Sequence, residues 1–153
     1  MEVPANFSKF IGNWSGNYKL YLGLEPDSIF ESKTNALVDF TAKGCFLKIE
    51  YDWFYQEKPH EGLILLGKDK DSQKFIAFWI DSFHLSDKYM VSEGGFDANE
   101  NISIKGSYSV PGYPDWGWKT VFDFSDEQSL KIIMYNISPE GIEELAVEAV
   151  YHK

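Results

Sequence analysis

The sequence has one cysteine, little positive charge and no long hydrophobic run, and each shortage excludes a class of protein. Because Cys45 is the single cysteine, no intramolecular disulfide can form, which excludes the disulfide-stapled secreted scaffolds. The 14 lysines, with no arginine beside them, are outnumbered by 24 aspartates and glutamates, for a net charge of −10. Such a chain repels phosphate backbones, so we expect no nucleic-acid partner. The longest clearly apolar run, residues 75–80, is far shorter than the ~20 residues of a membrane-spanning helix, so we expect no membrane partner.

The length of 153 residues predicts one domain that covers residues 1–153. A chain of this size buries enough surface to fold without disulfides or a structural metal. Residues 1–7 have neither the positive segment nor the apolar stretch of a signal peptide. Together with the single thiol, this predicts a cytoplasmic protein.

Turn-forming residues recur at short intervals along the chain, with strand-sized segments between them. Successive strand side chains point to opposite faces, so alternation of apolar and polar residues marks a strand with one buried face. In residues 46–55, every second residue from Leu47 to Tyr55 is apolar or aromatic, and charged residues lie between most of them. Residues 34–40 and 116–124 alternate in the same way. The pattern predicts an all-β, antiparallel barrel or sandwich built of successive hairpins.

Two segments have the spacing of a helix. Phe7, Phe10 and Ile11 suit one or two helical turns that plug the sheet near the N-terminus. Residues 139–151 also have helical spacing, but Ser138-Pro139-Glu140-Gly141 reads as a hairpin turn and the residues after it alternate as in a strand. We predict a closing strand in this segment, with a helix as the alternative.

Several short motifs follow one another in an order that resembles a known family. Gly12-Asn13-Trp14-Ser15-Gly16 looks like the Gly-x-Trp opening of lipocalin-like barrels. After it come Gly62, Gly67-Lys68-Asp69, Trp79-Ile80-Asp81-Ser82, Gly94-Gly95-Phe96-Asp97 and the terminal Tyr151-His152-Lys153. Their order and spacing resemble the bacterial domain-of-unknown-function family fifteen-seventy-nine, over nearly the whole chain.

The resemblance implies a single up-and-down, lipocalin-like barrel of about ten antiparallel strands, related to fatty-acid-binding and nitrobindin-like barrels, with no established activity. Trp14 would then close one barrel end, and Gly12 and Gly16 would permit close backbone packing there. A nitrobindin-like barrel would hold haem through a histidine on its last strand, where this chain has residues 145–148, Leu-Ala-Val-Glu. We therefore expect no haem and no other cofactor, unless His84 or His60 supplied an iron ligand.

The three histidines give little support for metal or hydrolase chemistry. His60, His84 and His152 have no second histidine or cysteine at zinc-ligand spacing, so we expect no metal site. Asp81-Ser82-Phe83-His84 contains the residue types of a hydrolase triad, but triads are usually drawn from separate elements. We interpret Asp81 and Ser82 as the end of a strand that makes turn hydrogen bonds, with His84 exposed.

Aromatic residues make up 17% of the chain, and aromatic side chains dominate the walls of small-molecule pockets. The leading hypothesis is a non-enzymatic carrier or sensor that holds a small hydrophobic or amphipathic molecule in a long internal cavity rimmed by Asp81 and His84. A barrel filled by its own side chains is the alternative. The candidate ligand-binding residues are Tyr51, Trp53, Trp79, Asp81, His84, Trp118 and Phe122.

Two other classes of function stay open. An enzyme would bring at least two titratable groups together inside the barrel, with Asp81, His84 or Glu148 as the acid or base. Otherwise Glu148 is expected on a solvated outer face. A structural or partner-binding protein would use residues 75–80 and 130–137, which are apolar on both faces and which a second subunit could cover in a homodimer.

Overall fold

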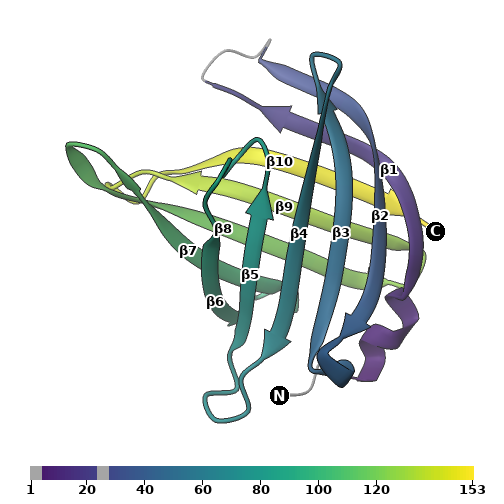
Figure 1. Cartoon of the computed structure of the whole chain (residues 1–153). Helices are drawn as coiled ribbons and strands as arrows, with labels where there is room; N and C mark the ends of the chain where they lie inside the picture. The colour runs from purple at the N-terminus through teal and green to yellow at the C-terminus, as the bar shows by residue number, and fades with distance from the viewer. Residues whose placement is uncertain (1–4, 24–27) are drawn as a thin grey trace.

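Ten antiparallel strands make up most of the computed structural model, which describes residues 5–23 and 28–153 (Figure 1). The strands are β1 (Gly12–Tyr21), β2 (Ile29–Thr41), β3 (Phe46–Tyr55), β4 (Lys58–Lys68), β5 (Phe75–Asp81), β6 (Met90–Phe96), β7 (Ile102–Val110), β8 (Tyr113–Asp126), β9 (Ser129–Ile137) and β10 (Glu143–His152). Two 3₁₀-helices, η1 (Ala5–Phe10) and η2 (Ala42–Gly44), accompany them. Neither helix is long and apolar enough to cross a membrane, nor is any other segment of the described ranges a helix of that kind.

The sheet closes on itself, because each strand pairs with its neighbours in the chain and β1 also pairs with β10. Strand alternation sorts the side chains between the two faces, as in β3, where Leu47 and Ile49 are buried while Glu50 and Asp52 are exposed. The prediction of an all-β, up-and-down barrel of about ten strands is confirmed. At the closing pair, a Cβ on Gly16 would overlap the carbonyl of Val150, so glycine permits the close approach of β1 and β10.

The last segment is a strand, as predicted. Residues 138–142 form the turn before β10, with the Gly141 N–H donating to the Ser138 carbonyl at 2.8 Å. The register between β9 and β10 shifts between Leu145 and Val147, and this bulge buries Ala146 and Val147 in succession. The shift explains why the sequence showed both helical and strand periodicity.

One end of the barrel, here called the closed end, is plugged by η1. Phe7 and Phe10 are buried, and their ring centroids lie 4.7 and 4.8 Å from that of Phe124. Trp14 is also buried and donates its indole N–H to the Phe10 carbonyl at 2.8 Å. The expected N-terminal plug is therefore present, as a 3₁₀-helix.

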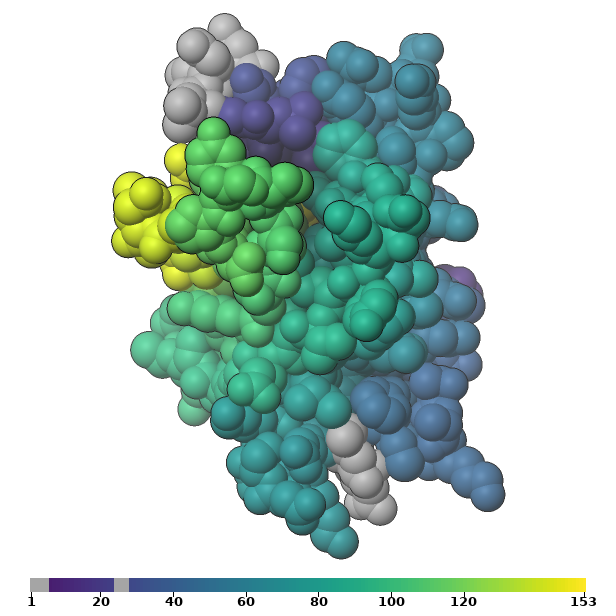
Figure 2. Space-filling view, turned by 60° about the vertical axis from the view of Figure 1, so that its left-hand side comes forward, coloured from purple at the N-terminus to yellow at the C-terminus, as the bar shows by residue number. Residues whose placement is uncertain are grey.

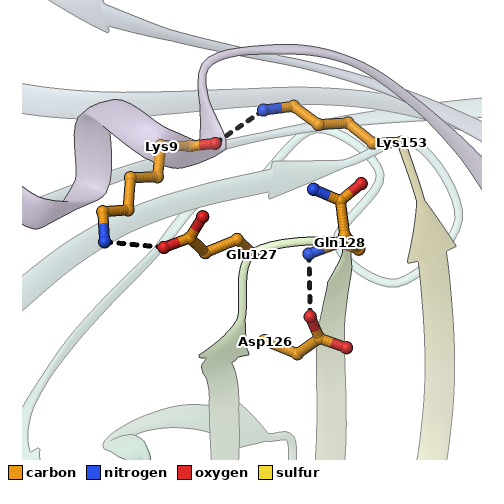
Figure 3. Close-up of polar contacts among 5 residues, drawn as sticks. All are labelled: Lys9, Asp126, Glu127, Gln128 and Lys153. Atoms are coloured by element: carbon orange, nitrogen blue, oxygen red, sulfur yellow. Dashed lines mark hydrogen bonds and ion pairs between the residues drawn. The ribbon is translucent and has the colours of Figure 1, made fainter.

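Polar contacts at the surface hold η1 against the ends of other strands (Figure 3). Lys9 pairs with Glu127, in the turn between β8 and β9, at 2.6 Å. Lys153 donates to the carbonyl oxygen of Lys9 at 2.6 Å, and its ammonium lies over the ring of Trp14. These contacts bring both ends of the described chain to the closed end.

The middle of the barrel is filled by its own side chains. A central space of only about 10 Å³ is bounded by Tyr18, Tyr51, Ile64, Ile132, Met134, Val147, Ala149 and Tyr151. That volume holds about one water molecule. The long internal cavity of the leading hypothesis is absent from this central region, because three tyrosines extend into it, and the wider hollows lie at the barrel end opposite η1. We call this the open end.

Candidate functional site

The connection between β5 and β6, residues 82–89, turns inward at the open end. Asp81, the last residue of β5, organises its first turn, because Oδ1 accepts hydrogen bonds from the N–H groups of Phe83 and His84, both at 2.9 Å. The Asp81 carbonyl accepts from the N–H groups of Leu85 and Ser86 at 3.0 and 3.1 Å. Phe83 and Leu85 pack against the core. The interpretation of Asp81 as a strand-ending turn residue is confirmed.

The carboxyl group of Asp81 is also the centre of a buried polar network. Its Oδ2 accepts from the Tyr51 hydroxyl at 2.6 Å and from the Trp53 indole N–H at 3.3 Å. The Trp79 indole donates to the Tyr51 hydroxyl at 2.8 Å. Asp81 is 1% exposed and lines neither of the hollows at the open end, whereas the sequence analysis placed it at the rim of an internal cavity. It lies beneath the open end with both oxygens already bonded, because the connection folds over it.

Tyr51, Gly62 and Asp81 lie in one row across β3, β4 and β5. Tyr51 is directly opposite Gly62, and Gly62 is directly opposite Asp81. A Cβ at Gly62 would overlap the ring of Tyr51. Because Gly62 has no side chain, the Tyr51 ring can cross β4 and reach the Asp81 carboxylate two strands away. This is a structural role for Gly62, which the sequence analysis named only as part of the family motifs.

His84 lies among aromatic side chains and is partly buried, so the prediction that it is exposed is wrong. Four ring centroids lie 5.1 to 5.8 Å from that of His84, belonging to Trp53, Trp79, Phe83 and Trp118. Its Nε2 is 3.1 Å from the hydroxyl of Tyr18. Burial lowers the pKa of His84 to about 4, and this effect outweighs the opposite influence of Asp81. The imidazole is therefore neutral at pH 7.

Tyr18 and Tyr51, which lie beneath His84, keep their hydroxyl protons. Burial raises the pKa of Tyr18 and of Tyr51 well above the ordinary value, and the neighbouring Asp81 carboxylate raises both further. Their hydroxyls therefore remain hydrogen-bond donors at physiological pH. The buried layer of Tyr18, Tyr51, Trp53 and Asp81 lies directly below His84.

Two hollows at the open end share a wall. The first, of about 730 Å³, lies between the β5–β6 connection and the adjoining ends of β7 and β8. The second, of about 450 Å³, lies between the end of β1, the beginning of β10 and the same part of β8. His84 and Trp118 line both. In the space-filling view, the green turn between β7 and β8 projects forward near this end of the barrel (Figure 2). Both volumes fall in the range of small-molecule pockets.

Trp118 places an unsatisfied polar group in the shared wall. The residue is 8% exposed, and its indole N–H has no acceptor among residues 5–23 and 28–153. A buried donor without an acceptor costs about 1–3 kcal/mol. An acceptor supplied by a bound molecule would remove that cost.

Asn136 and Tyr108 add polar groups that the sequence analysis missed. Asn136 lies directly opposite Trp118 in the β8–β9 pairing and lines the second hollow, while Tyr108 lines the first. The Tyr108 hydroxyl donates to Oδ1 of Asn136 at 2.6 Å. Burial raises the pKa of Tyr108. Asn136 could have been found from its inward position in the alternation of Ile132 and Met134.

The structure brings together six of the seven predicted ligand-binding residues. Trp79, His84 and Trp118 line the hollows. The next three, Tyr51, Trp53 and Asp81, belong to the hydrogen-bonded layer below. Phe122 lies apart from them, fully buried and 6.0 Å from Phe124 between ring centroids, on the side of η1.

The outer surface of the barrel also has a hollow. Glu148, on β10, lies on the outer surface but outside this hollow. The hollow, of about 710 Å³ over β1–β5, is lined in part by the exposed Leu37 and Ile80 and by Glu50. Ile80 belongs to the segment that is apolar on both faces. Glu148 alternates with buried neighbours on β10, so the expectation of an outer-face glutamate holds.

These features define a closed, all-β barrel with a side-chain-filled centre and hollows at one end. The chain belongs to the family described as a protein of unknown function (DUF1579), whose profile matches residues 4–153. The resemblance drawn from the motifs is thereby confirmed. No curated protein matches the chain.

Proposed function

We propose that this barrel binds a small hydrophobic or amphipathic molecule at its open end, without catalysing a reaction on it. The observation that carries the proposal is the wall shared by the two hollows, where the buried Trp118 indole N–H lacks an acceptor among the described residues. Native proteins seldom leave such a donor unpaired. A ligand with an oxygen or nitrogen acceptor would satisfy it while its apolar part contacted the surrounding rings.

The neighbouring groups support binding more than catalysis. Asp81 and His84 do lie together, as an enzyme would require. However, both Asp81 oxygens accept hydrogen bonds from protein groups, and the carboxyl group is buried. With a pKa of about 4, His84 is a weak base at pH 7. An acid/base reaction would need at least one of these groups to be available to a substrate.

Tryptophan fluorescence tests the proposal directly. A panel of fatty acids, retinoids and an apolar dye should contain members that change the emission saturably, because Trp79 and Trp118 line the hollows. Trp118→Phe should reduce the response. Trp14→Phe, the same substitution at the closed end, should leave the apparent affinity unchanged.

The same titrations also show which results would contradict ligand binding at the open end. If no member of the panel changes the emission, or if Trp14→Phe weakens binding as much as Trp118→Phe, then the open end is not the ligand site. Trp53, another of the candidate ligand-binding residues, should respond less to a ligand in the hollows, because it is fully buried and bonded to Asp81.

A further inference from the structure

Two neighbouring residues that carry N–H donors line the second hollow. Trp118 and Asn136 are directly opposite each other on β8 and β9, and both line this hollow. Residues directly opposite in an antiparallel pair have their Cβ atoms about 4.5–5.5 Å apart. The indole N–H of Trp118 has no acceptor within the described part of the chain.

The orientation of the Asn136 amide is fixed by Tyr108. Because the Tyr108 hydroxyl donates to Oδ1 at 2.6 Å, the oxygen end of the amide is used, and the Nδ2 amino group is left as the donor end. The wall of the second hollow therefore contains two N–H groups, from an indole and an amide, and neither carries a formal charge.

The charges near these donors disfavour an anion. Glu144 lines the same hollow, and Asp87 lines the other hollow beside Lys88. The chain has no arginine, the residue that recognises carboxylates in a bidentate manner, and its net charge is −10. His84, between the hollows, is neutral at pH 7. None of the described residues that line the second hollow is cationic, so a carboxylate bound there would lose its hydration without gaining a cation.

The rest of the wall favours an apolar, ring-shaped partner. The centroids of Trp79 and Trp118 are 5.4 Å apart with nearly parallel planes, and the His84 ring also lies 5.4 Å from Trp118. Leu20 and Leu145 add aliphatic surface to the second hollow. Such a wall provides apolar contact area around a small number of polar groups.

We infer that the ligand of the open end is an uncharged molecule with a carbonyl-type oxygen, as in a ketone, amide or ester, that accepts hydrogen bonds from Trp118 Nε1 and Asn136 Nδ2. Its apolar part lies against the aromatic wall. This inference rests on the proposed function and adds to it the chemical class of the ligand. A carbonyl oxygen has two lone pairs and can accept both bonds at once.

Three probes of nearly equal size separate the alternatives in calorimetric titrations at pH 7. Acetylnaphthalene carries a neutral carbonyl, ethylnaphthalene carries no acceptor, and naphthoate carries a charged one. Acetylnaphthalene should bind at least about tenfold more tightly than either of the others, a difference of about 1.4 kcal/mol. In an NMR spectrum of indole N–H groups, the resonance that Trp118→Phe removes should shift with acetylnaphthalene and much less with ethylnaphthalene.

Asn136→Asp provides a matched variant, because it keeps an oxygen for Tyr108 and removes the Nδ2 donor. It should narrow the advantage of acetylnaphthalene over ethylnaphthalene, because only the Trp118 donor remains and the new carboxylate repels the carbonyl oxygen. An unchanged affinity for ethylnaphthalene would show that the site is intact. Equal affinities of the wild-type protein for acetylnaphthalene and ethylnaphthalene, or tighter binding of naphthoate, would overturn the inference while leaving the proposed function in place. If none of the three probes bound and the fluorescence panel also gave no response, both would fail.

Discussion

The hydroxyl of Tyr51 lies 2.6 Å from Oδ2 of Asp81, although the two residues belong to strands separated by β4. The contact exists because the strand between them carries Gly62 at the crossing point. Asp81 in turn holds the N–H groups of Phe83 and His84. The barrel wall and the segment that shapes the open end are thus joined through one carboxylate.

Gly62→Ala should destabilise the protein by about 1–3 kcal/mol, because the added Cβ would overlap the Tyr51 ring and displace its hydroxyl from Asp81. Urea unfolding measures the change. Gly95→Ala is the matched control, since a Cβ there meets nothing within 4 Å, and it should change the free energy of unfolding by less than about 0.5 kcal/mol. Equal effects of the two substitutions would contradict the crossing as the reason for glycine.

His84 should make the protein less stable in acid. The ordinary histidine pKa is 6.5 and that of folded His84 is about 4. Between these values the unfolded chain binds a proton at this residue that the folded chain does not, so stability falls as the pH drops from 6.5 to 4. Above pH 6.5, the full contribution of His84 to the free energy of unfolding is present and does not change with pH. The slope due to His84 should approach about 1.4 kcal/mol per pH unit.

Carboxylates also titrate near pH 4, so the measurement compares two proteins. Urea unfolding of the wild type and of His84→Gln, at several values between pH 4 and 7, isolates the histidine contribution. The wild type should lose stability more steeply on acidification. Parallel curves would show that His84 titrates alike in the folded and unfolded chains.

Trp79→Phe should cost more stability than Trp118→Phe, by about 1 kcal/mol or more. The Trp79 indole donates to the buried Tyr51 hydroxyl at 2.8 Å, whereas that of Trp118 has no acceptor among the described residues. Both substitutions remove the same atoms from buried positions. Thermal or urea unfolding gives the comparison, and a larger loss for Trp118→Phe would mean that its N–H is bonded within the free protein.

At the closed end, Phe10→Ala should cost about 3–5 kcal/mol, because it opens a cavity beside Phe124 and Trp14. Lys9→Ala, in the same helix, should cost less than about 1 kcal/mol, because both partners of the Lys9–Glu127 pair are more than half exposed. Urea unfolding separates the two. If the two substitutions lowered the free energy of unfolding equally, η1 would stabilise the closed end through its surface contacts and not through its buried rings.

The barrel could be predicted because strand alternation has a period of two and each turn carries its own local signal, as in residues 46–55. The last strand was harder, since the bulge at Leu145 and Val147 interrupts that period. Family resemblance and the Ser138–Gly141 turn favoured the correct structure there.

The site could be predicted only in part. Trp79 and Trp118 could be predicted because they are aromatic and lie on the inward-facing side of their strands. The burial of His84 could not, because turn residues usually face solvent. Its surroundings come from distant parts of the chain, because the rings of Trp53 and Trp118 lie beside it and its Nε2 is 3.1 Å from the hydroxyl of Tyr18, 66 positions away in sequence. The pairing of Tyr108 with Asn136 likewise depends on the register of three strands, which no local pattern reveals.

The pairing of β10 between β1 and β9 also bears on how the chain acquires its structure during synthesis. Until β10 leaves the ribosome, β1 and β9 each expose an unpaired strand edge, and such edges readily pair with other chains. The joining of β1 to β10 is a contact between distant parts of the sequence, which is slow to form. Protection of these two edges from aggregation therefore depends on the synthesis of β10.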